Sequence, residues 1–166
     1  MFKLIKRMTA IALLGIVAAC GSDGGEDRNL VELAQGDSRF SILVEAVVAA
    51  DLDETLANLG PFTVLAPTDD AFAALLGELG VTREQLLADK SLLVEVLTYH
   101  MVPGEVLRAD VPIGAPITTV QGDTFTVDAN LVITDQRNRG ARIVDTDLRA
   151  RNGVIHAIDR VILPAP

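Results

Sequence analysis

The stretch of residues 62–72 constrains the fold most, because a strand, a corner and a helix start follow one another there without a gap. Its first residues alternate in side-chain character with the period of a β-strand. Pro67 then ends the pattern, since it lacks the backbone N–H that a central strand needs. Thr68 is a preferred helix N-cap, and Asp69 and Asp70 place carboxylates at the positive end of the helix dipole. We therefore expect Thr68 and Asp69 to be structural, rather than part of a paired general acid and base.

Amphipathic helices are predicted on both sides of this stretch. Residues 29–58 carry apolar side chains at helical spacing and end at a Gly-Pro pair. Thr82 and Gln85 form a capping-box pattern that predicts a short helix. Asp89 is the expected cap of a further helix over residues 90–102. The first half of the chain is therefore predicted to be mostly helical.

Strand patterns dominate the second half. Residues 117–120 and 124–127 flank a Gln-Gly-Asp turn, and further strand patterns cover 131–133 and 143–148. Residues 153–163 are apolar on both faces, which is typical of a strand in the middle of a packed structure. Because helices precede strands instead of alternating with them, the pattern indicates the α+β class.

The N-terminus has the pattern of a targeting segment. Residues 1–19 combine three basic side chains and no acid with an apolar run shorter than the roughly 20 residues that span a bilayer. The run ends in small residues before Cys20, the only cysteine, and resembles a bacterial lipobox in which Cys20 receives the lipid. Residues 20–28 then form a polar, glycine-rich tether. We expect one domain over residues 29–166.

This pattern predicts an extracytoplasmic domain that is lipid-anchored to a bacterial cell envelope. By resemblance to bacterial lipoproteins, the glycine after Cys20 favours the outer membrane, where the host has one. The lipid anchor is the one membrane contact we expect, because two or more acyl chains hold a protein stably.

Charge is distributed unevenly along the chain. The formal net charge of −9 argues against nucleic acid as a partner. Arginine is nevertheless frequent near the C-terminus, and Arg137, Arg139 and Arg142 stand close together in the sequence. Two interpretations remain open: a solvated loop and strand face, or a patch that meets an anionic partner such as an acidic glycan or protein.

The sequence contains no recognisable catalytic or metal-binding pattern. Its two histidines, His100 and His156, are not spaced as a ligand pair. We expect each to be a core residue that hydrogen-bonds to backbone or to a carboxylate. A Gly-x-Ser-x-Gly elbow, a phosphate-binding glycine loop and a Cys-x-x-Cys motif are all absent from the sequence. We therefore predict that the protein is not an enzyme and uses no cofactor or metal.

Three ordered blocks carry a resemblance to a known family. They are residues 62–72, the pair Tyr99-His100 at the end of an amphipathic helix, and residues 152–164. Together they closely resemble the fasciclin domain over about residues 29–164. The resemblance implies a single compact α+β domain, a wedge-like β-sandwich covered by several helices that come mostly from the N-terminal half. It also implies cell adhesion or extracellular interaction.

The resemblance suggests contact residues as well. In animal members, positions just before the last block are tied to integrin binding, and they match residues 145–149 here. Asp147 and Leu148 fit that pattern, whereas the two residues before them depart from it. Tyr99 is expected to be partly buried, and the family places it in an adhesive surface. Other fasciclin-like proteins bind carotenoids in a hydrophobic groove.

Two functions follow as hypotheses. The first is an envelope-anchored, non-catalytic module that binds an extracellular protein, glycan or matrix component, with the region from Arg137 to Arg151 as its contact surface. The alternative is a binder of a small apolar ligand, lipid or carotenoid-like, in a groove between helices and sheet.

Overall fold

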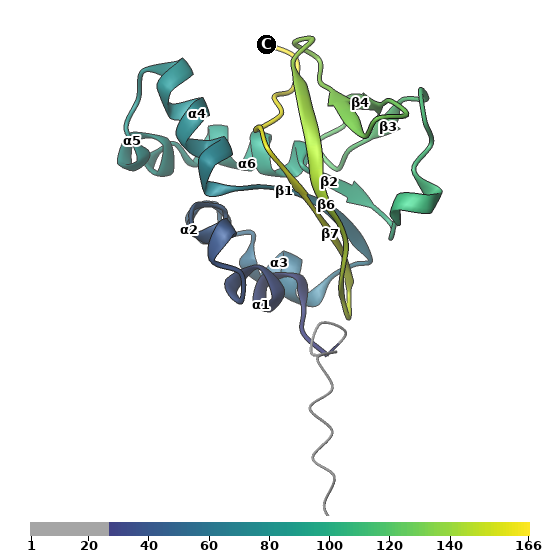
Figure 1. The fold of residues 1–166 in the computed structure, drawn as a ribbon. Helices are drawn as coiled ribbons and strands as arrows, with labels where there is room; N and C mark the ends of the chain where they lie inside the picture. The colour runs from purple at the N-terminus through teal and green to yellow at the C-terminus, as the bar shows by residue number, and fades with distance from the viewer. Residues whose placement is uncertain (1–26) are drawn as a thin grey trace, which may run out of the picture.

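The computed structural model describes residues 27–166, so the predicted signal peptide, Cys20 and most of the predicted tether lie outside the described residues. Helices come mostly from the first half of the described chain and strands mostly from the second (Figure 1). The α-helices are α1 (Leu30–Gln35), α2 (Ser41–Ala49), α3 (Asp53–Asn58), α4 (Asp69–Leu79), α5 (Arg83–Ala88) and α6 (Lys90–Tyr99), with 3-10 turns η1 (Ser38–Phe40) and η2 (Arg108–Asp110).

Residues 29–58 are helical as predicted, but two aspartates divide the stretch into three short α-helices. The Asp37 side chain accepts a hydrogen bond from the Arg39 N–H and so begins the 3-10 turn η1. Asp51 has a left-handed backbone with φ of 56°, which turns the chain between α2 and α3. Local side-chain and backbone geometry at these two aspartates therefore sets the boundaries of α2.

Side-chain caps begin the helices largely where the sequence indicates. The Thr68 hydroxyl accepts a hydrogen bond from the Ala71 N–H at 3.3 Å, which starts α4. Thr82 and Gln85 form a reciprocal capping box at the start of α5. The first helix, α1, begins with a second capping box between Asn29 and Glu32.

The seven strands are β1 (Phe62–Pro67), β2 (Met101–Pro103), β3 (Ile117–Thr118), β4 (Thr124–Val127), β5 (Val132–Thr134), β6 (Gly140–Ala150) and β7 (Gly153–Ile158), and they pair in the order β2-β1-β7-β6-β5-β4-β3. Strands β1 and β7 run parallel, with Phe62 opposite Gly153 and Pro67 opposite Ile158. The other strand pairs are antiparallel. The first and last motif blocks of the sequence therefore form neighbouring inner strands of the sheet.

Several element ends differ from the prediction, notably those of α6 and β7. Helix α6 ends at Tyr99, not at residue 102, because Met101–Pro103 leaves the helix and pairs with β1. Strand β7 ends at Ile158, although residues 161–163 remain buried beyond it. The chain after β7 therefore packs as an irregular segment against the core.

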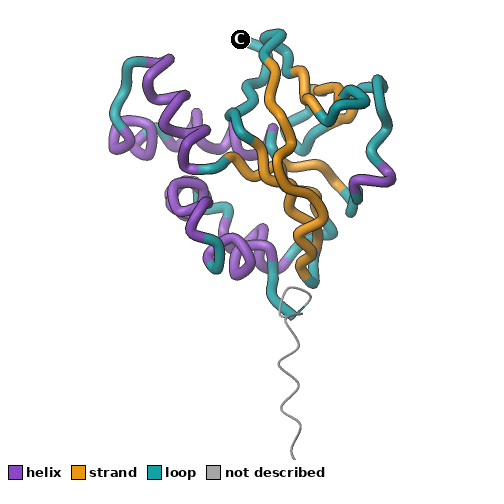
Figure 2. The backbone as a smooth tube through the Cα atoms, in the orientation of Figure 1, coloured by secondary structure: helices purple, strands orange, loops and turns teal. Residues whose placement is uncertain are grey.

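Alternation along β1 divides the interior into two apolar clusters. Val64 and Ala66 pack with the helices, whereas Leu65 faces Phe125 and Ile133 of the β4–β5 region. The helices accordingly lie on one side of the β6–β7 pair and strands β3 and β4 on the other (Figure 2). The result is the expected single α+β domain, in which a seven-stranded sheet forms a wedge covered by helices.

Candidate functional surface

The residues predicted to make contacts do not form one site. Arg137, Arg139 and Arg142 lie at the β5–β6 turn and the start of β6. Asp147 and Leu148 lie further along the same strand, and at about 3.3 Å per residue they stand roughly 20 Å from Arg142. Tyr99 is in the interior. Each group is therefore described separately.

The β5–β6 turn is organised by a buried carboxylate, Asp135. Its Oδ1 accepts hydrogen bonds from the N–H groups of Arg137 and Arg139, both at 2.9 Å. Its Oδ2 accepts from the Leu163 N–H at 3.0 Å, which ties the turn to the C-terminal segment. The arginine positions are thus fixed by main-chain contacts beneath them.

The arginine side chains differ in their availability for a partner. Arg139 is only 18% exposed and pairs with Glu78 of α4, which also pairs with Arg160 at 2.8 Å. The Arg137 Nε donates to the Pro164 carbonyl at 3.0 Å, while the side chain stays at the surface. Arg142 is exposed on β6. Arg139 therefore stabilises the fold, and Arg142 is the open member of the three.

The outward face of β6 also carries an exposed apolar residue. Val144, two positions after Arg142, is 51% exposed, whereas Ala141 and Ile143 on the opposite face are buried. An exposed cation beside an exposed aliphatic side chain provides both polar and apolar contact area. This part of β6 is the most open of the predicted contact regions.

Asp147 sits at an irregular point of β6. Its backbone has φ of 58°, and its N–H donates to the His156 Nδ1 at 3.2 Å. Its carboxylate accepts from the Arg108 N–H at 2.8 Å and stays exposed. The side chain therefore holds the η2 segment against β6 while remaining accessible.

Leu148 lines a polar cleft of about 300 Å³ between β6 and the α1–η1 region. Leu33, Phe40 and Arg28 contribute to the same cleft. The Arg28 carbonyl accepts a hydrogen bond from the Arg151 N–H at 2.8 Å, so ordered contacts begin inside the tether predicted over residues 20–28.

Both histidines make the main-chain hydrogen bonds expected of core residues. The His100 Nδ1–H donates to the Val96 carbonyl at 2.7 Å, and its Nε2 accepts from the Ile162 N–H at 3.2 Å. The His156 Nε2–H donates to the Val106 carbonyl at 2.8 Å, while its Nδ1 accepts a hydrogen bond from the Asp147 N–H. Burial lowers the pKa of His100 to about 4, so this ring is neutral near neutral pH.

The prediction of a partly buried Tyr99 in an adhesive surface is wrong, because its ring is fully buried. Its hydroxyl donates to the Thr124 carbonyl at 2.9 Å, and its ring packs edge-on against Phe125 with centroids 6.3 Å apart. Burial raises the pKa of Tyr99 to about 12. The residue joins α6 to the β-rich half of the core and cannot touch a partner directly.

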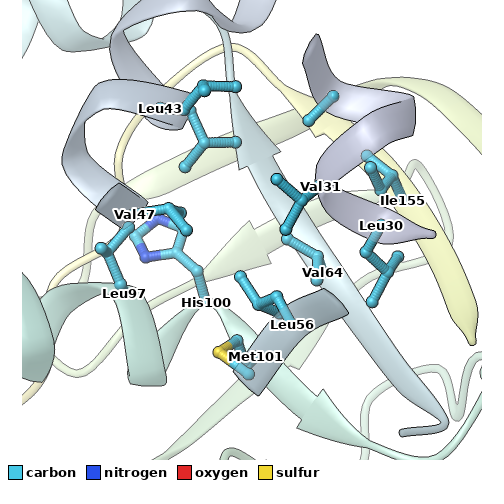
Figure 3. A pocket seen from close by; sticks show the side chains of 12 residues that line it. Leu30, Val31, Leu43, Val47, Leu56, Val64, Leu97, His100, Met101 and Ile155 are labelled. Atoms are coloured by element: carbon cyan, nitrogen blue, oxygen red, sulfur yellow. The ribbon is translucent and has the colours of Figure 1, made fainter. Parts of the chain in front are cut away.

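A small apolar cavity lies between the helices and the sheet, where a ligand groove was expected (Figure 3). Its volume is about 30 Å³. Twelve side chains line it: Leu30, Val31, Ala34, Leu43, Val44, Val47, Leu56, Val64, Leu97, His100, Met101 and Ile155. Sites for drug-sized ligands typically measure about 300–1,000 Å³, so this cavity is too small for a carotenoid.

Residues 38–164 match the family model of the Fasciclin domain. The chain belongs to the fasciclin domain family. Protein sll1483 of Synechocystis is 47% identical over 138 residues, which cover 81% of this chain and 73% of that protein. Transforming growth factor-beta-induced protein ig-h3 of Sus scrofa is 37% identical over 139 residues, 19% of its length. A fasciclin domain pair from the insect cell adhesion molecule Fasciclin I has the same fold, with a TM-score of 0.74 at 16% identity over 83% of this chain and 51% of that one.

This fasciclin domain depends on an asparagine whose role sequence reasoning did not find. The Asn152 Nδ2 donates to the carbonyls of Leu56 at 2.6 Å and Leu59 at 2.8 Å. Its Oδ1 accepts from the Leu30 N–H at 3.0 Å. An Asn-Gly pair signals a tight turn, but that signal does not reveal partners in α1 and after α3.

Asp69 has a second function beyond the start of α4. Its Oδ1 accepts from the Ile42 N–H at 2.8 Å and its Oδ2 from the Ser41 hydroxyl at 2.5 Å. It therefore satisfies donors at the first turn of α2 and joins two helices. Of the two adjacent aspartates, Asp69 makes these contacts and Asp70 is exposed, so they do not form a catalytic pair.

None of the helices in residues 27–166 is long and apolar enough to cross a bilayer. Within the same range, His, Cys, Asp and Glu side chains do not gather in threes as metal ligands. Within residues 27–166, the surface of β6 and the pockets beside the helices are therefore the candidate binding sites.

Proposed function

We propose that this fasciclin domain is a non-catalytic interaction module, lipid-anchored to a bacterial cell envelope, that binds an extracellular protein, glycan or matrix component. Its family membership is the observation that carries the proposal, because its fold matches a domain pair of an insect cell adhesion molecule. The N-terminal pattern before Cys20 supports the anchoring and an extracytoplasmic location, at the outer membrane where the host has one.

The side-chain geometry supports binding over catalysis. All four ring nitrogens of His100 and His156 are engaged with main-chain groups, so neither imidazole is placed to accept a proton from a substrate. The open part of β6 at Arg142 and Val144 is our candidate contact surface. Its guanidinium would attract an anionic partner, and its neighbouring valine would add apolar contact.

Membrane anchoring is tested by Cys20→Ala. We expect the variant to leave the membrane fraction, because the acyl chains provide the anchor. Fractionation followed by immunoblotting measures this, with the unmodified protein as reference. A variant that remains membrane-bound would refute the anchor.

Partner binding is tested by attachment of cells that display the full-length protein. Arg142→Glu should weaken attachment, and the loss should shrink as salt rises because surface charges are screened. Lys90→Glu is a matched control, since it also replaces an exposed cation by a carboxylate, but on α6 and outside the region from Arg137 to Arg151. Equal attachment by both variants and the parent would exclude the Arg142 surface.

The alternative, a binder of a small apolar ligand, has one observation in its favour, the apolar cavity beside His100. Its volume of about 30 Å³ argues for a group no larger than a methyl or a water. Mass spectrometry of natively purified protein distinguishes the two functions. A retained lipid or pigment would favour the alternative.

A further inference from the structure

A second apolar cavity lies between helices α4, α5 and α6 and has a volume of about 80 Å³. Its walls come from all three helices and from the C-terminal segment: Phe72, Leu75, Leu79, Leu86, Leu92, Leu93, Val96, Leu97 and Leu163, with Arg137 as the one charged residue. Most of these side chains are buried, whereas Leu79 is 45% exposed. The cavity therefore opens to the surface beside Leu79 and Arg137.

The guanidinium of Arg137 is held in position at this opening. Its Nε donates to the Pro164 carbonyl at 3.0 Å, and its main-chain N–H is bound by the buried carboxylate of Asp135. The nearby Glu78 does not neutralise it, because that carboxylate is shared between Arg139 and Arg160. The three arginines Arg137, Arg139 and Arg160 thus contact two carboxylates, those of Asp135 and Glu78, which leaves one net positive charge here in a protein with a net charge of −9.

We propose that this cavity receives a single aliphatic side chain of a protein partner, of leucine size, while Arg137 binds a carboxylate next to it. The inference rests on the proposed function, that the domain binds a protein, and specifies the partner's chemistry. A buried apolar anchor beside a charged hydrogen bond is the usual composition of an interface hot spot. The carboxylate can be an acidic side chain or a free C-terminus, since both present the same group.

The volume selects a side chain over a lipid. A space of about 80 Å³ corresponds to roughly two or three water volumes, which suits one branched aliphatic group. An extended acyl chain needs a site several times larger. Arginine suits the carboxylate because its planar fork donates two parallel hydrogen bonds.

The test uses isocaproate, which joins the leucine isobutyl group to a carboxylate. The full-length protein is placed in lipid nanodiscs with labelled leucine and valine methyl groups, and isocaproate is titrated while methyl resonances are followed. Saturable shifts should appear at Leu75, Leu79 and Leu93. Arg137→Glu should raise the dissociation constant about tenfold, which corresponds to loss of one charged hydrogen-bond pair. Arg108→Glu, the same charge change on the exposed η2 segment away from the cavity, should leave it unchanged.

One further variant and three further ligands test the cavity and the role of Arg137 separately. Leu79→Trp should block the opening without overfilling the core, and unchanged methyl signals from β5 would show that it folds. Binding that survives this variant would overturn the cavity assignment, and isocaproamide that binds as tightly as isocaproate would overturn the role of Arg137. Affinity that keeps rising from hexanoate to decanoate would reveal a lipid site instead of a side-chain site.

Peptides then separate the two sources of the carboxylate. A peptide that ends in a free C-terminal leucine and one with an internal Asp-Leu pair are titrated in the same way. Binding by either supports the proposal and identifies the source, whereas binding by neither refutes a protein partner at this cavity. The titrations do not depend on cell attachment, so failure of the attachment assay and failure here are distinguishable.

Discussion

Acidification from about pH 7 to about pH 5 should lower the free energy of unfolding of this domain. Most of the loss should come from protonation at His100, and less from titratable side chains at the surface. The imidazole is fully surrounded, with its Nδ1–H bonded to Val96 and its Nε2 accepting from Ile162. A proton added at Nε2 would remove the acceptor that Ile162 uses and place a charge in the apolar core. Burial therefore lowers the pKa of His100 from 6.5 to about 4.

The sign and size of the effect follow from that difference. Above about pH 6.5 the ring is neutral in both states, and the full stability is present. Below it the unfolded chain binds a proton that the folded chain does not, so stability falls by about 1.4 kcal/mol per pH unit until the folded pKa is reached. At about pH 5 the loss is about 2 kcal/mol, before carboxylates titrate appreciably.

The assay compares the parent with His100→Gln, which keeps a polar side chain but cannot titrate. Urea unfolding at a series of pH values between about 7 and 5 gives the free energy of unfolding of each protein. The variant should be less stable at neutral pH, and its deficit should shrink by about 2 kcal/mol as the pH falls. Contributions from groups other than residue 100 are common to both proteins and cancel. A constant difference across this range would refute the assignment of a depressed pKa to His100.

Three substitutions test other features. Gly153→Ala should destabilise the domain by about 3 kcal/mol in urea unfolding, because a Cβ would lie 2.0 Å from the Phe62 carbonyl and the φ of Gly153 is 154°. A loss below about 1 kcal/mol would contradict this close approach of the two backbones. Gly77→Ala should stabilise it by about 1 kcal/mol and raise Tm by about 2–4 °C, since a Cβ there meets nothing within 4 Å; an unchanged Tm would argue against a helical Gly77. Tyr99→Phe should lower the free energy of unfolding by about 1 kcal/mol and leave partner attachment unchanged. Attachment lost without a loss of stability would contradict the buried, structural role of Tyr99.

Local features of this fold could be predicted because they depend on neighbouring residues. The strand, corner and helix start over residues 62–72 follow from alternation, a proline and a cap, all within one short stretch. The capping box at Thr82 is equally local. In contrast, the left-handed backbone of Asp51 between α2 and α3 is not set by a local pattern, because aspartate adopts that conformation more often than most residues but still uncommonly.

Long-range contacts explain what the sequence could not reveal. Arg139 is one of several closely spaced arginines, and only the fold shows that Glu78 neutralises it. Tyr99 stands at the end of an amphipathic helix, where the sequence is compatible with an exposed or a buried ring. Only the fold shows that its hydroxyl donates to the Thr124 carbonyl of β4. The cavity at Arg137 also combines three helices with the C-terminal segment, which no local pattern brings together.

The parallel pairing of β1 with β7 has a consequence for the order in which the chain can fold. Strand β1 is synthesised early, but its partner follows about 90 residues later, near the end of the chain. A growing chain therefore cannot pair β1 with β7 until the last strand has left the ribosome, and such distant pairing slows folding. Delayed closure would keep the chain extended long enough to be threaded across a membrane, as the export proposed for this protein would require.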